Sequence, residues 1–445
     1  MSRRPLALAL ALVLLPAAAQ ADDLLQSYQN ARSSDPQYAA AESSRAVAAE
    51  RPVQARANLL PDIGGSVGVD RLDRGGAGGA SRTGSWGLSL NQSLFSLGNY
   101  SALRGAKAQD RAGGFTLESA GQNLITRTSA AYFNVLVQLE TLTAAEAAET
   151  ALKKQFDFAS KRLEVGLAPI TDVHEARAQY DGARANTILA RNAVRDAYQA
   201  LVEITGAPVA NLKGLPDDFK PALPSEKGVD AWVADALATN PDLKAQEASL
   251  EAAEAGVSTA RAGHLPTLGL QATYGKALPG LYDNPAFVGS NDASTSVGLT
   301  LNIPIFTGFA TQSGVRTALA QRDGAADAVE QTRRAIERST RNAYQAVVAG
   351  ISEVEARRLA LVSAQSAYDA SQVGLEVGTR TVLDVLNNQR TLFSAQQAYA
   401  QAKYNFLQSR LLLEQSAGTL DVTDVEDINR LLTTDKAIDQ TLAVR

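Results

Sequence analysis

Four short stretches of the chain alternate apolar and polar residues, the pattern of a strand with one apolar face. Their apolar members are Ile63, Val67 and Val69; Trp86, Leu88, Leu90 and Leu94; Leu268, Leu270, Ala272 and Tyr274; and Val297, Leu299, Leu301 and Ile303. A Gly-rich stretch (75–79) separates the first two, and a stretch rich in Pro, Gly and Asn (276–295) separates the last two. The pattern predicts two β-hairpins built from strands of about ten residues.

The rest of the pattern is helical. Residues 98–165 and 308–377 contain no proline, and a helix of ~68 residues would be roughly 100 Å long. Apolar residues recur at sevens, for example at Val347, Val354, Leu361, Tyr368 and Leu375. The returning stretches, 173–201 and 385–413, keep the same spacing. A sustained heptad predicts helices packed side by side as a coiled coil. Residues 22–57 are predicted as a further helix, because they lack strand alternation and Pro61 follows them.

The chain also repeats itself. Ser34-Asp35-Pro36 matches Thr239-Asn240-Pro241 at an offset of 205, and Leu163-Glu164-Val165-Gly166 matches Leu375-Glu376-Val377-Gly378 at 212. Matches in the same order at a near-constant offset indicate a duplication. We predict a first repeat at 22–225 and a second at 226–445, each reading helix, two strands, very long helix, turn and returning helix.

The N-terminus indicates secretion. Arg3 and Arg4 precede an apolar run from Leu6 to Leu15, and Ala19-Gln20-Ala21 fits a cleavage site. We therefore predict a signal peptide at 1–21. The sequence contains no Cys, so a lipidated N-terminus is not expected.

Composition excludes several classes of function. Without Cys and with 2 His, thiolate, metal and proton-relay chemistry have few candidate residues. His174 has no serine or metal partner near it in the sequence, and His264 is expected to be structural. The net charge of -5 disfavours nucleic-acid binding. We expect no enzyme activity, no metal and no cofactor.

The strands suggest a membrane. One face is apolar and the other is Ser, Gly, Asn and Thr, the alternation of an outer-membrane barrel strand. Trp86 and Tyr274 are amphipathic aromatics of the kind found at membrane interfaces. Four strands cannot close a barrel, and lipid tolerates no open sheet edge. Three chains would supply twelve strands, so a shared barrel in a symmetric trimer is one solution. A soluble sandwich on a periplasmic or envelope coiled-coil protein, structural or adhesive, is the alternative.

Two motifs decide between these readings by resemblance. They are Val165-Gly166…Thr171-Asp172-Val173 and Glu376-Val377-Gly378-Thr379-Arg380…Leu383-Asp384-Val385-Leu386. With the order of elements, they resemble the TolC family of outer-membrane efflux proteins, in its unlipidated form, over essentially the whole mature chain. The resemblance implies a mixed α+β, mainly α membrane protein. It would be a homotrimer whose twelve-stranded shared barrel in outer-membrane lipid continues as an α-helical coiled-coil tunnel into the periplasm.

The resemblance also implies a function. The trimer would be the passive exit duct of a tripartite system for multidrug efflux, type I protein secretion or both. An inner-membrane pump of RND or ABC type would recruit it through a periplasmic adaptor (membrane fusion) protein docking near 155–185 and 367–397. The connector 206–230 and the C-terminal equatorial tail would pack around the middle of the tunnel. The cargo, the adaptor and any receptor role of the loops at 73–82 and 276–295 stay open.

The turns between long helices carry the candidate site. Gly166 and Gly378 allow the positive φ at which a helix ends. Asp172 and Asp384 follow in the first turn of each returning helix, where a carboxylate caps free N–H groups. In a trimer, Asp384 would instead also form a ring of carboxylates that attracts cations at a narrow mouth.

The resemblance assigns further roles at these turns. Asp384 matches an entrance aspartate of the family, whereas the family's second aspartate is here Asn387, which should halve the charge of the ring. Arg380 matches a residue that is linked to the positions of Thr171 and Asp172 and holds the tip closed. Leu375 stands where the family often has tyrosine and cannot add a link, so we expect a looser gate that opens like an iris.

Overall fold

The computed structural model describes residues 23–73, 80–209, 211–216, 218–278 and 293–437. The predicted signal peptide (1–21), the Gly-rich stretch (75–79) and most of the loop at 276–295 lie outside these residues. The chain divides into two compact units. The helical unit takes residues 1–40, 119–240 and 335–445, and the strand unit takes residues 41–118 and 241–334.

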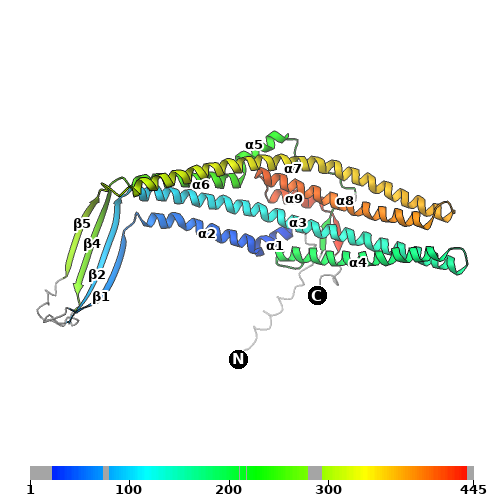
Figure 1. The fold of residues 1–445 in the computed structure, drawn as a ribbon, viewed down its shortest axis with the longest axis horizontal. Helices are drawn as coiled ribbons and strands as arrows, with labels where there is room; N and C mark the ends of the chain where they lie inside the picture. The colour runs from blue at the N-terminus through cyan, green and yellow to red at the C-terminus, as the bar shows by residue number, and fades with distance from the viewer. Residues whose placement is uncertain (1–22, 74–79, 210, 217, 279–292, 438–445) are drawn as a thin grey trace, which may run out of the picture. The chain divides into compact units, whose positions relative to one another are not determined.

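The strand unit contains a four-stranded antiparallel sheet (Figure 1). Its strands are β1 (Asp62–Asp73), β2 (Ala80–Phe95), β4 (Thr267–Ala277) and β5 (Ser294–Asn302), in the order β1-β2-β4-β5. Because β2 pairs with β4, the two predicted hairpins join into one sheet. β1 has 12 residues and β2 has 16, so both exceed the predicted length.

The register places the predicted apolar residues on one face of this sheet, except for two. Leu94 lies at a register shift between Ser93 and Phe95, and Ile303 follows the end of β5. Leu90 opposes Ala272, which in turn opposes Val297, and directly opposed residues point to the same side. The other face carries small polar residues, among them Thr273 and Ser296, whose hydroxyl oxygens lie 2.7 Å apart. The alternation of the sequence is therefore an alternation of faces in the fold.

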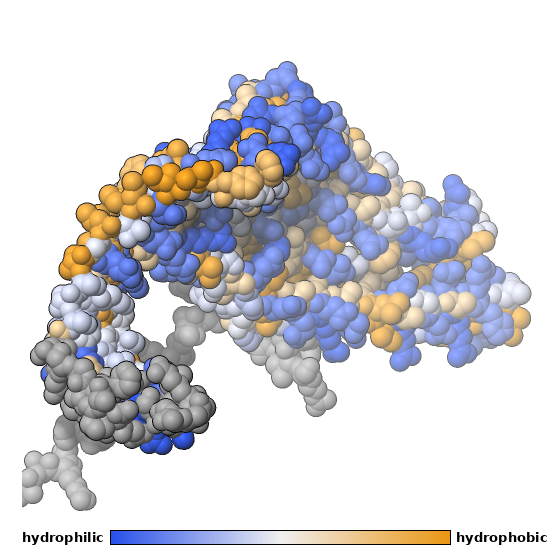
Figure 2. All heavy atoms as spheres, turned by 60° about the vertical axis from the view of Figure 1, so that its left-hand side comes forward, coloured by the Kyte–Doolittle hydropathy of each residue, from blue (hydrophilic) through white to orange (hydrophobic). Residues whose placement is uncertain are grey.

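The apolar face is uncovered in the single chain. Val67 is 75% exposed and Val297 is 71% exposed. Figure 2 shows apolar residues gathered on the surface of the strand unit. A contiguous apolar surface of this kind marks contact with protein or membrane, so this face needs an apolar partner.

The long helices are present as predicted. α3 (Leu97–Glu164) has 68 residues and α7 (Ala310–Glu376) has 67, and both contribute residues to the two units. The returning helices α4 (Ile170–Thr205) and α8 (Val382–Ala417) have 36 residues each. At 1.5 Å per residue, α3 and α7 are each about 100 Å long.

The heptad positions of α7 form a seam within the helical unit. Val347 and Val354 are buried. The later positions, which are half-buried, are Leu361, Tyr368 and Leu375. Between α3 and α4 the ring of Phe156 stacks on that of Tyr180, with centroids 6.2 Å apart. The seam thins toward the turns, where the candidate site lies.

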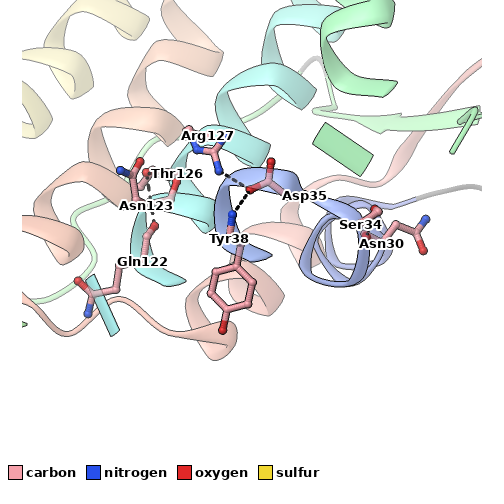
Figure 3. Close-up of polar contacts among 8 residues, drawn as sticks. All are labelled: Asn30, Ser34, Asp35, Tyr38, Gln122, Asn123, Thr126 and Arg127. Atoms are coloured by element: carbon pink, nitrogen blue, oxygen red, sulfur yellow. Dashed lines mark hydrogen bonds and ion pairs between the residues drawn. The ribbon is translucent and has the colours of Figure 1, made fainter. Parts of the chain in front are cut away.

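The predicted helix at 22–57 is two helices, α1 (Leu24–Ser34) and α2 (Pro36–Ala57). The break falls at Asp35, whose ψ of 118° is extended, because a proline disfavours helical backbone in the residue before it. Figure 3 shows how the break is stabilised. The Asp35 carboxylate accepts the N–H of Tyr38 at 2.8 Å and an Arg127 guanidinium N–H from α3 at 2.7 Å.

The same closure occurs twice in the helical unit. At the end of α1, the Ser34 hydroxyl donates to the carbonyl of Thr205, the last residue of α4, at 2.6 Å. At the end of α5 (Val229–Thr239), the Thr239 hydroxyl donates to the carbonyl of Ala417, the last residue of α8, at 2.7 Å. α6 (Pro241–Ala262) follows α5 as α2 follows α1. The closure thus recurs at matching places in the two predicted repeats, and the duplication stays a prediction.

The tail packs against the connector between the predicted repeats. β3 (Asn211–Gly214) pairs antiparallel with β6 (Thr434–Ala437). α9 (Val422–Leu431) buries Val425 and Ile428. The C-terminal segment is thus an ordered part of the helical unit up to residue 437.

Candidate functional site

The turn between α3 and α4 ends the first long helix on a left-handed glycine. Gly166 has a φ of +75°, and its N–H donates to the Leu163 carbonyl at 2.9 Å. The N–H of Leu167 reaches back to the Arg162 carbonyl at 2.7 Å. This pair of bonds satisfies carbonyls that the helix end would leave free, and it requires glycine at the positive φ.

The turn between α7 and α8 has the same geometry. Gly378 has a φ of +78°, and the N–H of Thr379 donates to the Gly374 carbonyl at 2.8 Å. The N–H of Arg380 reaches the same carbonyl at 3.1 Å. Both predicted turn glycines therefore occupy positions where only glycine is free of strain.

Asp384 forms a reciprocal cap with Thr381, the N-cap residue of α8. The N–H and hydroxyl of Thr381 donate to the Asp384 carboxylate at 2.9 and 2.8 Å, and the N–H of Asp384 donates to the Thr381 hydroxyl at 3.3 Å. These two donors of Thr381, with a smaller contribution from the charge of Arg380, hold the pKa of Asp384 below its usual range. The carboxylate is thus kept charged at the start of α8.

Asp172 does not repeat this arrangement. The N-cap residue of α4 is Pro169, which offers no side-chain cap bond. The backbone N–H of Asp172 donates to the Pro169 carbonyl at 3.2 Å, but among the described residues the Asp172 carboxylate accepts no hydrogen bond. The expected cap is absent here because Pro169 has neither an N–H nor a hydroxyl to donate to the Asp172 carboxylate. The Asp172 carboxylate stays available to another partner.

Arg380 lies exposed at the second turn. In the described part of this single chain it forms no ion pair with Asp172 and no hydrogen bond with Thr171, which is also exposed. The predicted link between the turns therefore stays a prediction for the assembled protein. Asn387 is exposed one turn into α8, and Leu375 is half-buried at the end of α7.

Both turns expose apolar side chains. Val165 and Leu167 of the first turn are 67% and 68% exposed, and Val377 of the second is 68% exposed. Ile170 and Leu383, at the starts of the returning helices, are exposed as well. Apolar residues at the tip of a helical hairpin suit a partner that is itself apolar and helical.

Trp86 and Tyr274 lie together in the strand unit. Their ring centroids are 5.6 Å apart in an edge-to-face arrangement, which the pairing of Leu88 with Tyr274 brings about. Both rings belong to the apolar face of the sheet, as the alternation predicts.

Sequence reasoning missed two residues of the second turn. Thr381, three positions before Asp384, was readable as a capping box of the type Thr-x-x-acid. Gly374, whose carbonyl gathers the turn's hydrogen bonds, left no signal, because a glycine inside a helical stretch follows no pattern.

Other chemistry finds no support in the described residues. They contain no group of three His, Asp or Glu side chains that could hold a metal ion, and His174 and His264 are both exposed. None of the described helices is long and apolar enough to cross a membrane.

Comparison with known proteins gives one consistent result. A sequence model described as "Outer membrane efflux protein" matches residues 27–207 and 232–419. "Outer membrane protein TolC" of Escherichia coli (strain K12) is 35% identical over 448 residues, which cover 96% of this chain and 88% of that protein. "Alkaline protease secretion protein AprF" of Pseudomonas aeruginosa is 29% identical, over 93% of this chain and 88% of that one.

Among solved structures, the Campylobacter jejuni CmeC outer membrane channel superposes with a TM-score of 0.76. The match covers 92% of this chain and 90% of that one at 18% identity, so it bears on the fold alone. The fold and the sequence matches indicate the same class of protein.

Proposed function

Because the chain belongs to the outer membrane efflux protein family, we propose that it acts as the exit duct of a tripartite export system. It lies in the outer membrane, with its helices extending into the periplasm. The matching family model is described as an efflux protein, and one relative is named a protease secretion protein. These names support multidrug efflux and type I protein secretion alike. The alternative of a structural or adhesive coiled-coil protein has no support among these relatives.

The observation that carries the proposal is the uncovered apolar face of the sheet. The residues of this face point to one side of all four strands, whereas the opposite face is small and polar. Lipid fits the apolar side and water the polar side. Because β1 and β5 are free edges and lipid tolerates none, three chains would close twelve strands into one barrel.

A duct of this kind needs no catalytic group. Water lines its polar side, so cargo selection belongs to the pump rather than to the wall. We therefore infer that the chain has no enzymatic activity, in keeping with relatives that are channels.

The two turns would form the gate at the periplasmic end. Thr171, Asp172, Arg380 and Asp384 would come together around the trimer axis, with Asn387 one turn further into α8. The free carboxylate of Asp172 and the exposed guanidinium of Arg380 suit a bidentate pair between hairpins. Such a pair contributes only ~1 kcal/mol when partly exposed, so a partner's binding energy can open it.

The exposed apolar residues of the turns would receive that partner. We propose a periplasmic adaptor that docks near 155–185 and 367–397 and links the duct to an inner-membrane pump. Deletion of the gene tests the cargo: cells should become more susceptible to toxic small molecules, or should cease to release a secreted protein. Native mass spectrometry of the detergent-solubilised protein should give three chains. A monomer, with export intact in the deletion strain, would contradict the proposal.

A further inference from the structure

Gly374 lies in the last turn of α7, two residues before its end, and is buried. Its carbonyl accepts three hydrogen bonds from the turn: from the N–H of Thr379 at 2.8 Å, the N–H of Arg380 at 3.1 Å and the hydroxyl of Thr379 at 3.2 Å. The backbone of residue 374 is therefore the point on which residues 379 and 380 are folded back.

The α-carbon of Gly374 is also covered by a side chain. A β-carbon added to Gly374 would lie 2.6 Å from Cγ of Arg380, 3.2 Å from its Cβ and 3.3 Å from the Thr379 hydroxyl oxygen. The two nearest atoms belong to the root of the arginine side chain, not to its flexible end. The stem of Arg380 thus lies directly against the bare face of Gly374.

The two glycines of this turn serve different needs. Gly378 requires glycine for its positive φ and has nothing within 4 Å of an added β-carbon. Gly374 has helical backbone, where glycine is less favourable than alanine by roughly 1 kcal/mol. What glycine provides at 374 is space.

This space and the arginine occur together in one half of the chain. At the 212-residue offset that relates the two turns, Gly374 corresponds to Arg162 and Arg380 to Ala168. The first turn therefore has no glycine at the position of Gly374 and no arginine at the position of Arg380. The pairing points to a joint role rather than to a general need of the helix end.

We propose that Gly374 is a positioning residue for the gate: its bare α-carbon seats the stem of Arg380 and so fixes where the guanidinium is held at the turn. The inference rests on the proposed gate and names the residue that orients its arginine. Gly374 touches no cargo and acts through Arg380 alone.

Gly374→Ala gives the proposal a distinctive signature. The added β-carbon would overlap Cγ of Arg380, so the side chain has to leave its present χ1 rotamer. Because staggered rotamers are about 120° apart, the guanidinium would move away from its link. Alanine is the better helix former, so α7 should not lose stability. The gate should therefore loosen while the fold holds.

The test is the conductance of single channels in planar lipid bilayers for the full-length protein and four variants: Gly374→Ala, Arg380→Ala, the double variant and Gly324→Ala. We expect Gly374→Ala and Arg380→Ala each to raise the open fraction, roughly fivefold or more, and the double variant to match Arg380→Ala. Gly324→Ala, which adds a methyl group in the same helix α7 with nothing within 4 Å, should behave as the wild type. Melting temperatures should agree among all five proteins.

The outcomes separate the two claims. If Arg380→Ala leaves the conductance unchanged, the proposed gate is wrong. If Arg380→Ala opens the channel and Gly374→Ala does not, or if the two effects add in the double variant, the positioning role is wrong and the gate stands. If Gly374→Ala fails to assemble but the double variant assembles, the clash with the Arg380 stem is demonstrated. If neither Gly374→Ala nor the double variant assembles, the clash is not with the Arg380 stem, and the inference is overturned.

Discussion

Burial shifts the pKa of individual side chains in this protein, and Glu414 near the end of α8 is the clearest case. Its side chain is 8% exposed, and its Oε2 atom has no hydrogen-bond partner among the described residues. Burial, with a smaller contribution from Asp424 on α9, raises the pKa of Glu414 to about 8. The Arg410 guanidinium, 3.8 Å from the Glu414 carboxyl, lowers this pKa, but not enough to reverse the shift. Asp427 adds a small further increase. Glu414 is thus protonated at neutral pH.

Glu414 should make the stability of the helical unit depend on pH. Its folded pKa is raised from 4.5 to about 8, so its contribution is fully present below pH 4.5 and is lost as the pH rises through about 8. We expect the melting temperature of the wild type to fall from pH 6 to pH 9, and Glu414→Gln to remove most of that fall. Glu353→Gln, at an exposed carboxyl paired with Arg357, should keep the wild-type slope. Equal slopes for the wild type and Glu414→Gln would contradict this account.

At the scale of elements, one buried ion pair ties α3 to α8. Lys403 is 2% exposed and its ammonium group lies 3.3 Å from the Glu140 carboxylate. The Tyr404 hydroxyl donates to the same carboxylate at 3.0 Å and accepts the N–H of Leu215 at 3.3 Å. The network therefore joins both helices to the connector that precedes α5.

Removing one member of this pair should be costly. Glu140→Ala leaves a buried ammonium group without its partner, so we expect a loss of ~3–5 kcal/mol in the free energy of unfolding. The double variant Glu140→Leu/Lys403→Met should recover most of it, because an apolar pair of similar volume replaces the ions. Glu146→Ala, which breaks an exposed pair with Arg191, should cost at most ~1 kcal/mol. Denaturant unfolding of the wild type and the three variants measures these differences in stability. A double variant as unstable as Glu140→Ala would refute the explanation.

Elements with a strong period were predictable from the sequence, and contacts between distant segments were not. Heptads located α3 and α7 closely, and alternation located the four strands but underestimated the lengths of β1 and β2. The break at Asp35 was readable from the following proline but was missed. The pairing of β2 with β4 and of β3 with β6 joins segments far apart in the chain, and local pattern does not encode such pairing. The seat of Arg380 on Gly374 depends on a turn geometry that only the fold supplies.

The two faces of the sheet should respond oppositely to charge. Leu299→Arg places a charge on the apolar face, where a lipid midplane would make it cost ~2–4 kcal/mol per chain. Thr300→Arg places the same charge at the neighbouring position, which points to the polar face of the sheet. We expect Leu299→Arg to reduce the protein recovered from outer membranes at least tenfold and Thr300→Arg to change it little. Similar recovery of the two variants would speak against a lipid-facing sheet.

The functional molecule requires more than one chain. The sheet has two free edges and an uncovered apolar face, and the two turns present an unpaired carboxylate and an exposed arginine. In a threefold-symmetric trimer, the free sheet edges would pair with those of the neighbouring chains. The same symmetry would bring Arg380 within reach of Asp172. The presence of Asn387 in place of a second acidic residue should leave three carboxylates at the entrance, and hence only moderate cation selectivity.

The proposed exit duct is tested most directly by the single-channel conductance of the purified protein in a planar bilayer, beside that of Asp172→Ala/Arg380→Ala. We predict a small, cation-selective conductance that grows in the variant, because the links between the two turns hold the wild-type entrance nearly closed. Folded protein that neither inserts nor conducts would contradict the duct itself. A large conductance that is the same in both proteins would leave the duct and remove the gate.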